Sequence, residues 1–483
     1  YKIARLELSN LFYSPVAWFL LVVLVFVAGF QFTGKLEELA RAQAYGSSLY
    51  ALSGNIFYGL GGLWGTMKEV FFFGMPLLTM GLLSQEHSLG TIKLLYSSPI
   101  STRQIVAGKY LGIMFYGLLV MVLLCVPVAV GAVVIDNFEW QTVLTGLLGL
   151  YLLWGLYSAV GLFMSTLTTY QLVSAVCMLG MVFVLRVVSN VGQEYPVVRD
   201  ITYWLSIESR ADNFIKGLIC SEDVLYFVIL SVMFVCFAVL RMQMGRERRT
   251  GWSKAGRYVG VFVAAMLLGY LTSRPMVKFY YDSTYTKSNT LSETSQEIVN
   301  GLEGGLTITT YSNLLGHDYR LTPRNVRRDM DRYENFLRFK PETELKYVFY
   351  YAADTASASF KHYHGSKTVE EAARYTAELT GDNLRWYLTP EEISKNADVV
   401  SHDYKFLSVV ERENGQKAYL RAFNDTRRLP SEKEISAVLR SFLVPAPRIG
   451  FLETNTERRL AGRGNGDYHS LADESFRFSP VNQ

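Results

Sequence analysis

The sequence lacks the short motifs that would mark the chain as an ATP-hydrolysing enzyme or a common hydrolase. No G-x-x-x-x-G-K-[ST] phosphate loop occurs, and the glycine clusters Gly59–Gly65 and Gly301–Gly305 lack the lysine and hydroxyl that hold phosphate and magnesium. Neither H-E-x-x-H nor G-x-S-x-G is present. We therefore expect no catalytic site and no bound cofactor in this chain.

Metal-binding and nucleic-acid-binding signals are also scarce. Most of the cysteines lie in apolar runs, so neither a disulfide framework nor a cysteine metal site is indicated. His362 and His364 on a strand would project to one face as metal ligands can, but no third ligand is fixed by spacing, and an exposed polar edge is the simpler interpretation. The net charge of +4 is too small to predict nucleic-acid binding. We therefore expect no metal site and no nucleic-acid partner.

Apolar residues make up 50% of the chain, and most of them precede about residue 273. Long apolar runs predict membrane-spanning helices, because one span needs about 20 mostly apolar residues. We predict six spans and then a seventh, at residues 16–32, 70–83, 110–135, 143–164, 172–188, 224–240 and 258–271. The segment 34–65 is expected to be an external loop that re-enters the membrane interface, with Lys68 and Glu69 at the outer end of the second span.

Lysine and arginine are unevenly distributed among the segments that join these spans. If the N-terminus is cytoplasmic, the inside segments carry the larger share, including the basic stretch from Arg241 to Arg257. This stretch could also bind anionic lipid, although a topology signal explains it more simply. Seven spans then place everything after Thr272 on the outer face.

Arg186 is the one strong charge well inside a predicted span. An intramembrane charge is by default a candidate functional residue. Arg186 lies near the outer end of its span, however, so a side chain that reaches the head groups is the simpler explanation.

A polar segment, Glu86–Lys109, separates the second and third spans. Gly90 opens a short amphipathic stretch that Pro99 ends, and Ser101 with Gln104 forms a capping box for the next helix. Two short helices at the ends of two spans form a surface suited to a partner that pushes on both. An ion pair between Glu86 and Lys109 could clamp the two spans together, and as an exposed pair it would be worth at most about 1 kcal/mol. An ordinary charged loop is the alternative.

This segment resembles the cytoplasmic loop of ABC-2-type exporter permeases, which contacts the ATPase subunit. The residues that the resemblance assigns to ATPase coupling are Glu86, Gly90, Thr91, Leu94, Leu95, Tyr96, Pro99 and Lys109. A second segment, around Phe214, Lys216 and Gly217, resembles the external re-entrant segment of the same permeases.

The resemblance implies the permease subunit of an ATP-driven exporter in a bacterial inner membrane, with its N-terminus in the cytoplasm. It further implies a homodimer or a second permease, and two copies of an ATPase subunit that binds ATP and Mg.

From Asp282 the composition changes to that of a soluble domain. Three capping boxes predict helix starts, at Thr368 with Glu371, Thr389 with Glu392, and Ser431 with Glu434. Strand-like runs alternate with these helices, at 306–311, 346–351, 404–410, 418–423 and 448–452, and Asn414-Gly415 predicts a hairpin turn. The alternation predicts an α/β domain with a mostly buried sheet.

Residues 282–311, with 448–454 and 457–458, resemble the extracytoplasmic auxiliary subunit of the gliding-motility (Gld) ABC transporter family. In that family the permease and the auxiliary subunit are as a rule separate chains, whereas here they are joined. The family's domain continues toward a last membrane anchor, so we expect this domain to be C-terminally incomplete.

Together these patterns predict a polytopic α-helical membrane domain, with six ABC-2-type spans and a seventh, followed by a soluble α/β domain. The expected parts are 1–245 for the permease, 246–273 for the basic loop and seventh span, and 274–483 for the periplasmic domain. The alternative is a non-transporting assembly or sensor protein whose spans only anchor the outer domain. Co-purification of an ATPase that depends on the Glu86–Lys109 loop distinguishes the two.

Overall fold

The computed structural model describes residues 1–46, 51–59, 61–97, 99–188, 191–244, 251–274, 278–316, 321–396, 399, 404, 407–421 and 430–445. The chain forms two compact units. The first comprises residues 1–189 and 201–289, and the second comprises residues 190–200 and those from 290 onward.

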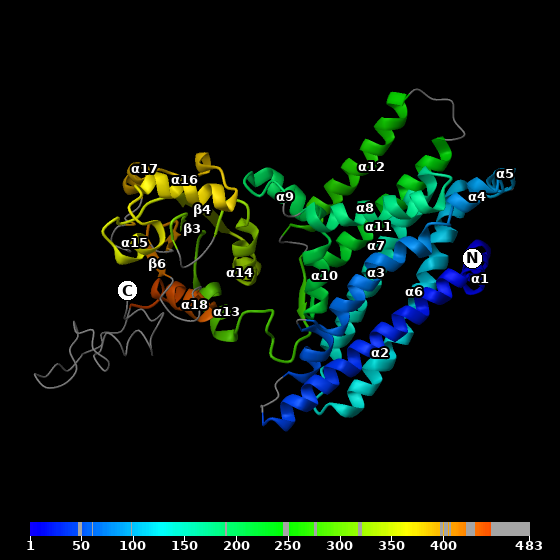
Figure 1. Cartoon of the computed structure of the whole chain (residues 1–483), viewed down its shortest axis with the longest axis horizontal. Helices are drawn as coiled ribbons and strands as arrows, with labels where there is room; N and C mark the ends of the chain where they lie inside the picture. The colour runs from blue at the N-terminus through cyan, green and yellow to red at the C-terminus, as the bar shows by residue number, and fades with distance from the viewer. Residues whose placement is uncertain are drawn as a thin grey trace, which may run out of the picture. The chain divides into compact units, whose positions relative to one another are not determined.

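The first unit is a helical bundle in which long apolar helices lie side by side (Figure 1). Shorter helices and strands lie between some of the long helices and at both ends of this unit. The long helices are α2 (Pro15–Ala44), α3 (Leu63–Thr79), α6 (Thr102–Val134), α7 (Trp140–Leu167), α8 (Gln171–Val187), α11 (Ser221–Met244) and α12 (Gly251–Thr272). The short elements are α1 (Lys2–Tyr13), η1 (Gly54–Tyr58), α4 (Ser84–Ser88), α5 (Ile92–Ser97), α10 (Glu208–Ile215), β1 (Leu218–Cys220) and β2 (Tyr280–Asp282). Helix α9 (Pro196–Leu205) is divided between the two units at residue 200.

Six helical segments among the described residues are long and apolar enough to cross a membrane. They include α2, α6, α7, α11 and α12, together with the continuous segment around α3. The remaining apolar helix, α8, has 17 residues and corresponds to the predicted fifth span. The helical, membrane-like character predicted for this part of the chain is therefore confirmed.

Helix α7 forms the centre of the bundle, since it packs against α3, α6, α8 and α11. Its side chains Trp154 and Tyr157 are almost fully buried. Close approach of the neighbouring helices depends on glycine: a Cβ on Gly117 of α6 would lie 2.3 Å from the Trp154 indole nitrogen, which no real Cβ can do. The core of the membrane region is therefore packed around aromatic side chains that fit against small residues.

Two predictions about local structure are wrong. The segment 34–65 is not one loop, because α2 continues to Ala44 and α3 begins at Leu63, so Lys68 lies inside α3 and is buried. The pair His362 and His364 lies in helix α15 (Ala358–His364) and not on a strand. Among the described residues, no group of three or more His, Cys, Asp or Glu side chains is placed to hold a metal ion.

The second unit contains a four-stranded sheet with the strand order β4-β3-β5-β6. Its strands are β3 (Leu306–Asn313), β4 (Thr343–Tyr350), β5 (Leu407–Arg412) and β6 (Lys417–Arg421). β3 pairs with β4 in parallel, whereas β5 is antiparallel to both of its neighbours. The predicted hairpin is confirmed, since Asn414 and Gly415 lie in the turn between β5 and β6. The predicted run at 448–452 lies outside the described residues.

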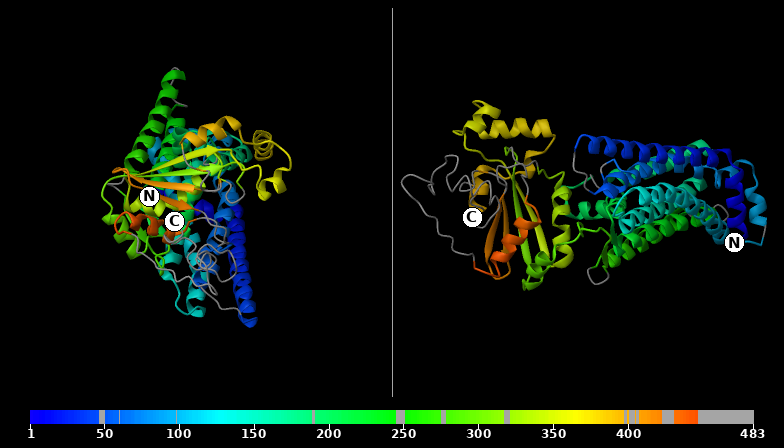
Figure 2. Two further views of the ribbon diagram at one scale, coloured as in Figure 1. Left: turned by 90° about the vertical axis from the view of Figure 1, so that its left-hand side faces the viewer. Right: turned by 90° about the horizontal axis from the view of Figure 1, so that it is seen from below.

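One face of this sheet carries the core of the second unit. Leu306 and Ile308 of β3 pack with Val410 of β5 against α13 (Glu293–Gly301), α14 (Val326–Phe339) and α18 (Glu432–Ser441). Both views of Figure 2 show the yellow-green to orange strands as one sheet with helices against it. The opposite face is covered only in part, by α17 (Pro390–Asn396), so the sheet is less buried than its sequence predicts.

The predicted capping boxes begin helices in this unit. Thr368 with Glu371 caps α16 (Val369–Thr380), and Ser431 with Glu434 caps α18. The backbone amide of Thr389 donates to Glu392, and the amide of Glu392 donates to the Thr389 hydroxyl. These local signals were readable because each depends on residues only three positions apart.

We predict that Ile308→Ala destabilises the second unit by about 2–5 kcal/mol, because it leaves a cavity under the central strand. Hydrogen exchange of the β3 and β4 amides in the full chain should then accelerate. Thr307→Ala, on the other face of β3, is the matched control and should change exchange little. Equal effects of the two substitutions would contradict the assignment of the core to one face.

Candidate functional site

The polar segment between α3 and α6 folds into two short helices, as its sequence predicts. Gly90 joins α4 to α5 with a φ of +72°, a conformation that residues with a Cβ rarely adopt. The Thr91 hydroxyl donates to the carbonyl of Glu86 over 3.4 Å, and the capping box of Ser101 and Gln104 begins α6. The loop is therefore a defined structure that leads directly into a long apolar helix.

A buried lysine connects this segment to two other parts of the chain. Lys109 of α6 places its Nζ 2.7 Å from Glu86 Oε1 of α4 and 2.9 Å from Glu7 Oε2 of α1. Lys109 is 5% exposed and Glu7 is 8% exposed, whereas the side chain of Glu86 is 24% exposed and so only partly buried. We call Glu7, Glu86 and Lys109 the buried triad; it joins α1, α4 and α6 through a single ammonium group.

Glycines on α6 allow α1 to come close enough for this contact. A Cβ on Gly108 would lie 2.7 Å from Ile3, and one on Gly112 would lie 2.8 Å from the Cβ of Glu7. Because neither glycine has a side chain, the backbone of α1 lies directly on α6. Glu7 is thereby carried to Lys109, from 102 residues away in the sequence.

The burial of the triad changes the energetics expected from the sequence. An exposed pair is worth at most about 1 kcal/mol, whereas removing one partner of a buried pair costs about 3–5 kcal/mol because a charge is left without compensation. The triad carries two carboxylates and one ammonium, and Glu86 Oε2 is buried with no hydrogen-bond partner. The expectation of an exposed Glu86–Lys109 pair is therefore wrong.

The apolar side chains of α5 do not all face the same way. Ile92 is 7% exposed and belongs to the core of the bundle, whereas Leu94 is 71% exposed. Leu89, just before Gly90, is also exposed, as is Pro99. The side chains of Leu95 and Tyr96 lie outside the described part of the structure. We call Leu89 and Leu94 the loop surface; Ile92 is excluded from it.

Arg186 belongs to a network of charged side chains on α3, α8 and α10. Its guanidinium lies 2.7 Å from Glu69 and 2.9 Å from Glu208, and Lys68 lies 2.5 Å from Glu208 and 2.7 Å from Asp212. The head-group explanation for Arg186 is therefore wrong, because its charge is compensated within the protein. This network fastens α10 to α3 and α8.

A second buried arginine fixes α10 from its other side. Arg210 is 2% exposed and lies 2.6 Å from Asp223 and 3.1 Å from Glu222, both in the first turn of α11. Burial alone would lower the pKa of the guanidinium, but the two carboxylates raise it, so the charge is retained. No spacing pattern in the sequence pairs Arg210 with these two acids, so sequence reasoning missed this contact.

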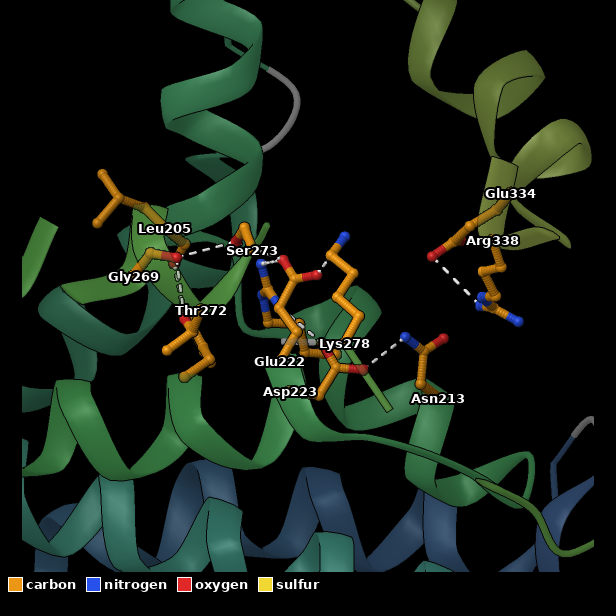
Figure 3. Close-up of polar contacts among 12 residues, drawn as sticks. Leu205, Asn213, Glu222, Asp223, Gly269, Thr272, Ser273, Lys278, Glu334 and Arg338 are labelled. Carbon is orange, nitrogen blue, oxygen red and sulfur yellow. Dashed lines mark hydrogen bonds and ion pairs between the residues drawn. The ribbon is translucent and has the colours of Figure 1, made fainter. Parts of the chain in front are cut away.

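The two carboxylates have further partners, which Figure 3 shows converging on them. Asn213 donates to Asp223 over 2.9 Å. Ser273, just after α12, donates to Glu222 over 2.9 Å, and Lys278 lies 2.7 Å from the same carboxylate. The cluster thus joins α10 and α11 to the end of α12, and every charge in it has a partner.

The predicted re-entrant segment is held tightly in the bundle. Phe214 is fully buried against α7, where a Cβ on Gly149 would lie 2.3 Å from the Phe214 Cβ. Gly217 has a φ of +89°, and its carbonyl accepts the amide of Ser283 over 2.8 Å. Lys216 between them is exposed. These residues fix the turn between α10 and α11 and leave one cation at the surface.

We predict that Lys109→Met lowers the stability of the full chain by about 3 kcal/mol, because Glu7 and Glu86 then share a buried region without a counter-charge. The double variant Glu7→Gln/Lys109→Met should recover a large part of this loss. Thermal unfolding in detergent measures both, with Lys93→Met, which removes an exposed lysine, as the control. A Lys109→Met protein as stable as the control would show that the triad is energetically neutral.

Comparison with protein families identifies the membrane region. Residues 1–240 match the family model described as ABC-2 family transporter protein, whereas no curated protein sequence matches the chain. The match covers α1 to α10 and most of α11, including the loop with the buried triad, the Arg186 network, and Arg210 with its two carboxylates. Residues 1–240 are accordingly similar to ABC-2 family transporter proteins, and this match supports a transmembrane transporter subunit.

Proposed function

We propose that the chain is the permease subunit of an ATP-driven exporter and that the loop from Glu86 to Lys109 receives the movement of a separate ATPase subunit. The buried triad is the observation that carries this proposal. A force applied to α4 or α5 acts on Glu86, and through Lys109 it acts on α6 and α1 together. Without such a connection, a displaced surface loop would deform and leave the spans in place.

The loop surface supports the same proposal from outside. Leu89 and Leu94 are large apolar side chains exposed on a short, glycine-hinged structure. Interfaces concentrate their binding energy in a few large side chains that become buried. An ATPase subunit could bind to these two apolar side chains and move the spans through the buried triad. That subunit would bind ATP and Mg.

The topology proposed with this function places the N-terminus and the loop in the cytoplasm. The described segments at this end include the exposed residues Lys93, Arg103 and Arg241. The part of the chain after α12 then lies on the outer face, in the periplasm if the membrane is a bacterial inner membrane. We further propose that two permease copies, or this chain and a second permease, work with two ATPase subunits, because one bundle rarely encloses a path by itself.

The second unit is proposed to be a soluble extracytoplasmic domain that serves the transporter. Its sheet with helices on one face is consistent with an independently folded α/β domain. The gliding-motility resemblance is kept as a proposal for residues 282–311, and its other positions, 448–454 and 457–458, lie outside the described residues.

We predict that Leu94→Asp abolishes recovery of ATP-hydrolysing activity with the tagged full chain, because a charge replaces an exposed apolar anchor. Gly90→Pro should act in the same way, since proline fixes φ near −65° and the loop needs +72°. ATPase activity in the affinity-purified sample is the measurement. Each variant must still elute as wild-type protein does.

The matched control is Tyr45→Asp, which places the same charge at an exposed position at the opposite end of α2. It should leave the recovered ATPase unchanged. If Leu94→Asp and Gly90→Pro also retain the ATPase at wild-type levels, the coupling role is wrong, and a protein that only anchors an outer domain becomes the better explanation.

A further inference from the structure

A groove in the membrane region, which begins at the C-terminal end of the Glu86–Lys109 segment, has the properties of a lipid site. Its volume is about 370 Å³, within the range of ligand sites. Helices α6, α7 and α11 form it, through residues such as Leu111 and Met114, Leu152, and Val228 and Val232. Leu111, Val228 and Val232 are about half exposed, so the groove opens to the outside of the bundle in segments long enough to span a membrane.

The polar groups in the wall are already hydrogen-bonded to the protein. The Tyr110 hydroxyl donates to the carbonyl of Gly155 over 3.3 Å, and Ser231 is a hydrogen-bond partner of the same hydroxyl. The hydroxyl protons of these two side chains are therefore already used within the protein, and the rest of the described wall is apolar, which suits an alkyl chain. The volume equals roughly a dozen water-sized groups at ~30 Å³ each, which suits one segment of an acyl chain.

A basic residue lies on the same face of α6 as the groove. Arg103 precedes Ala107 by four positions and Tyr110 by seven, so the three residues lie on one side of the helix. Its charge also acts on Cys236 of α11, next to the lining residue Val235, so Arg103 is near two of the three helices that form the groove. Arg103 is exposed, at the first turn of α6, where an apolar span meets the membrane surface.

We propose that this groove binds one acyl chain of an anionic phospholipid, with the phosphate of the head group at Arg103. The groove supplies apolar surface for the chain, and Arg103 supplies the charge that selects the head group. This site is separate from the loop surface, and it holds a lipid that stays with the protein whether or not an ATPase is bound.

Native mass spectrometry of the full chain, titrated with palmitoyl-oleoyl phosphatidylglycerol or phosphatidylcholine, tests the proposal. Wild-type protein should retain one phosphatidylglycerol, with occupancy several-fold above that of phosphatidylcholine. Ala107→Phe fills the groove from its exposed side and should reduce occupancy at least tenfold. Ala129→Phe, exposed on the same helix but not in the groove, is the matched control and should bind as wild type does.

Two further measurements distinguish the contribution of the lipid's acyl chain from that of its head group. Arg103→Gln should keep the bound lipid but lose the preference for phosphatidylglycerol, whereas Lys93→Gln should keep both. Glycerophosphoglycerol, which has no acyl chains, should not bind.

The proposal is overturned if Ala107→Phe retains the same lipid as Ala129→Phe, or if Arg103→Gln keeps the full preference. Should Ala107→Phe fail to elute as folded protein, Val232→Phe fills the same groove from α11 and gives the same test.

Discussion

The membrane region depends on the ammonium group of Lys109 and the two carboxylates that hold it. A buried lysine is stable only while its charge is compensated, and the compensation comes from two helices that are far apart in the sequence. The three helices therefore cannot separate without leaving a charge buried and unpaired. This constraint makes α1, α4 and α6 one mechanical piece, and it gives a short surface loop a connection to a helix 33 residues long.

The two arginine clusters apply the same constraint to α10 at a different place in the bundle. Arg186 and Lys68 hold it to α3 and α8, and Arg210 holds it to the start of α11. Helix α10 is thus held in place by ion pairs on two of its sides as well as by the burial of its apolar side chains. Buried ion pairs contribute little net stability but strongly penalise rearrangement, so these clusters favour movement of α10 together with its neighbours.

Much of this architecture could be predicted from the sequence because it depends on local or compositional signals. Apolar runs gave the long helices, and residue pairs three positions apart gave the capped helix starts. Lys68, Glu7 and Arg210 could not be placed in the same way, because their partners lie 102 or more residues away, or across a turn, and depend on how the helices pack. Arg186 was recognised as unusual, but a buried network and a surface position look alike in sequence.

The loop was predicted as a unit, yet the orientation of its side chains was not. Ile92 and Leu94 are both apolar residues of the same short helix, yet Ile92 packs into the bundle and Leu94 is exposed. In a helix of six residues, apolar spacing alone cannot tell which face meets the protein and which meets a partner.

Site-specific crosslinking at the loop surface tests the central claim most directly. A photo-reactive p-benzoyl-phenylalanine placed at Leu94 in the full chain, in native membranes, should give an adduct that contains an ATP-binding protein. The same group at Tyr45 should give none. An adduct at Leu94 with no ATP-binding protein, or the same adduct from both positions, would contradict the account.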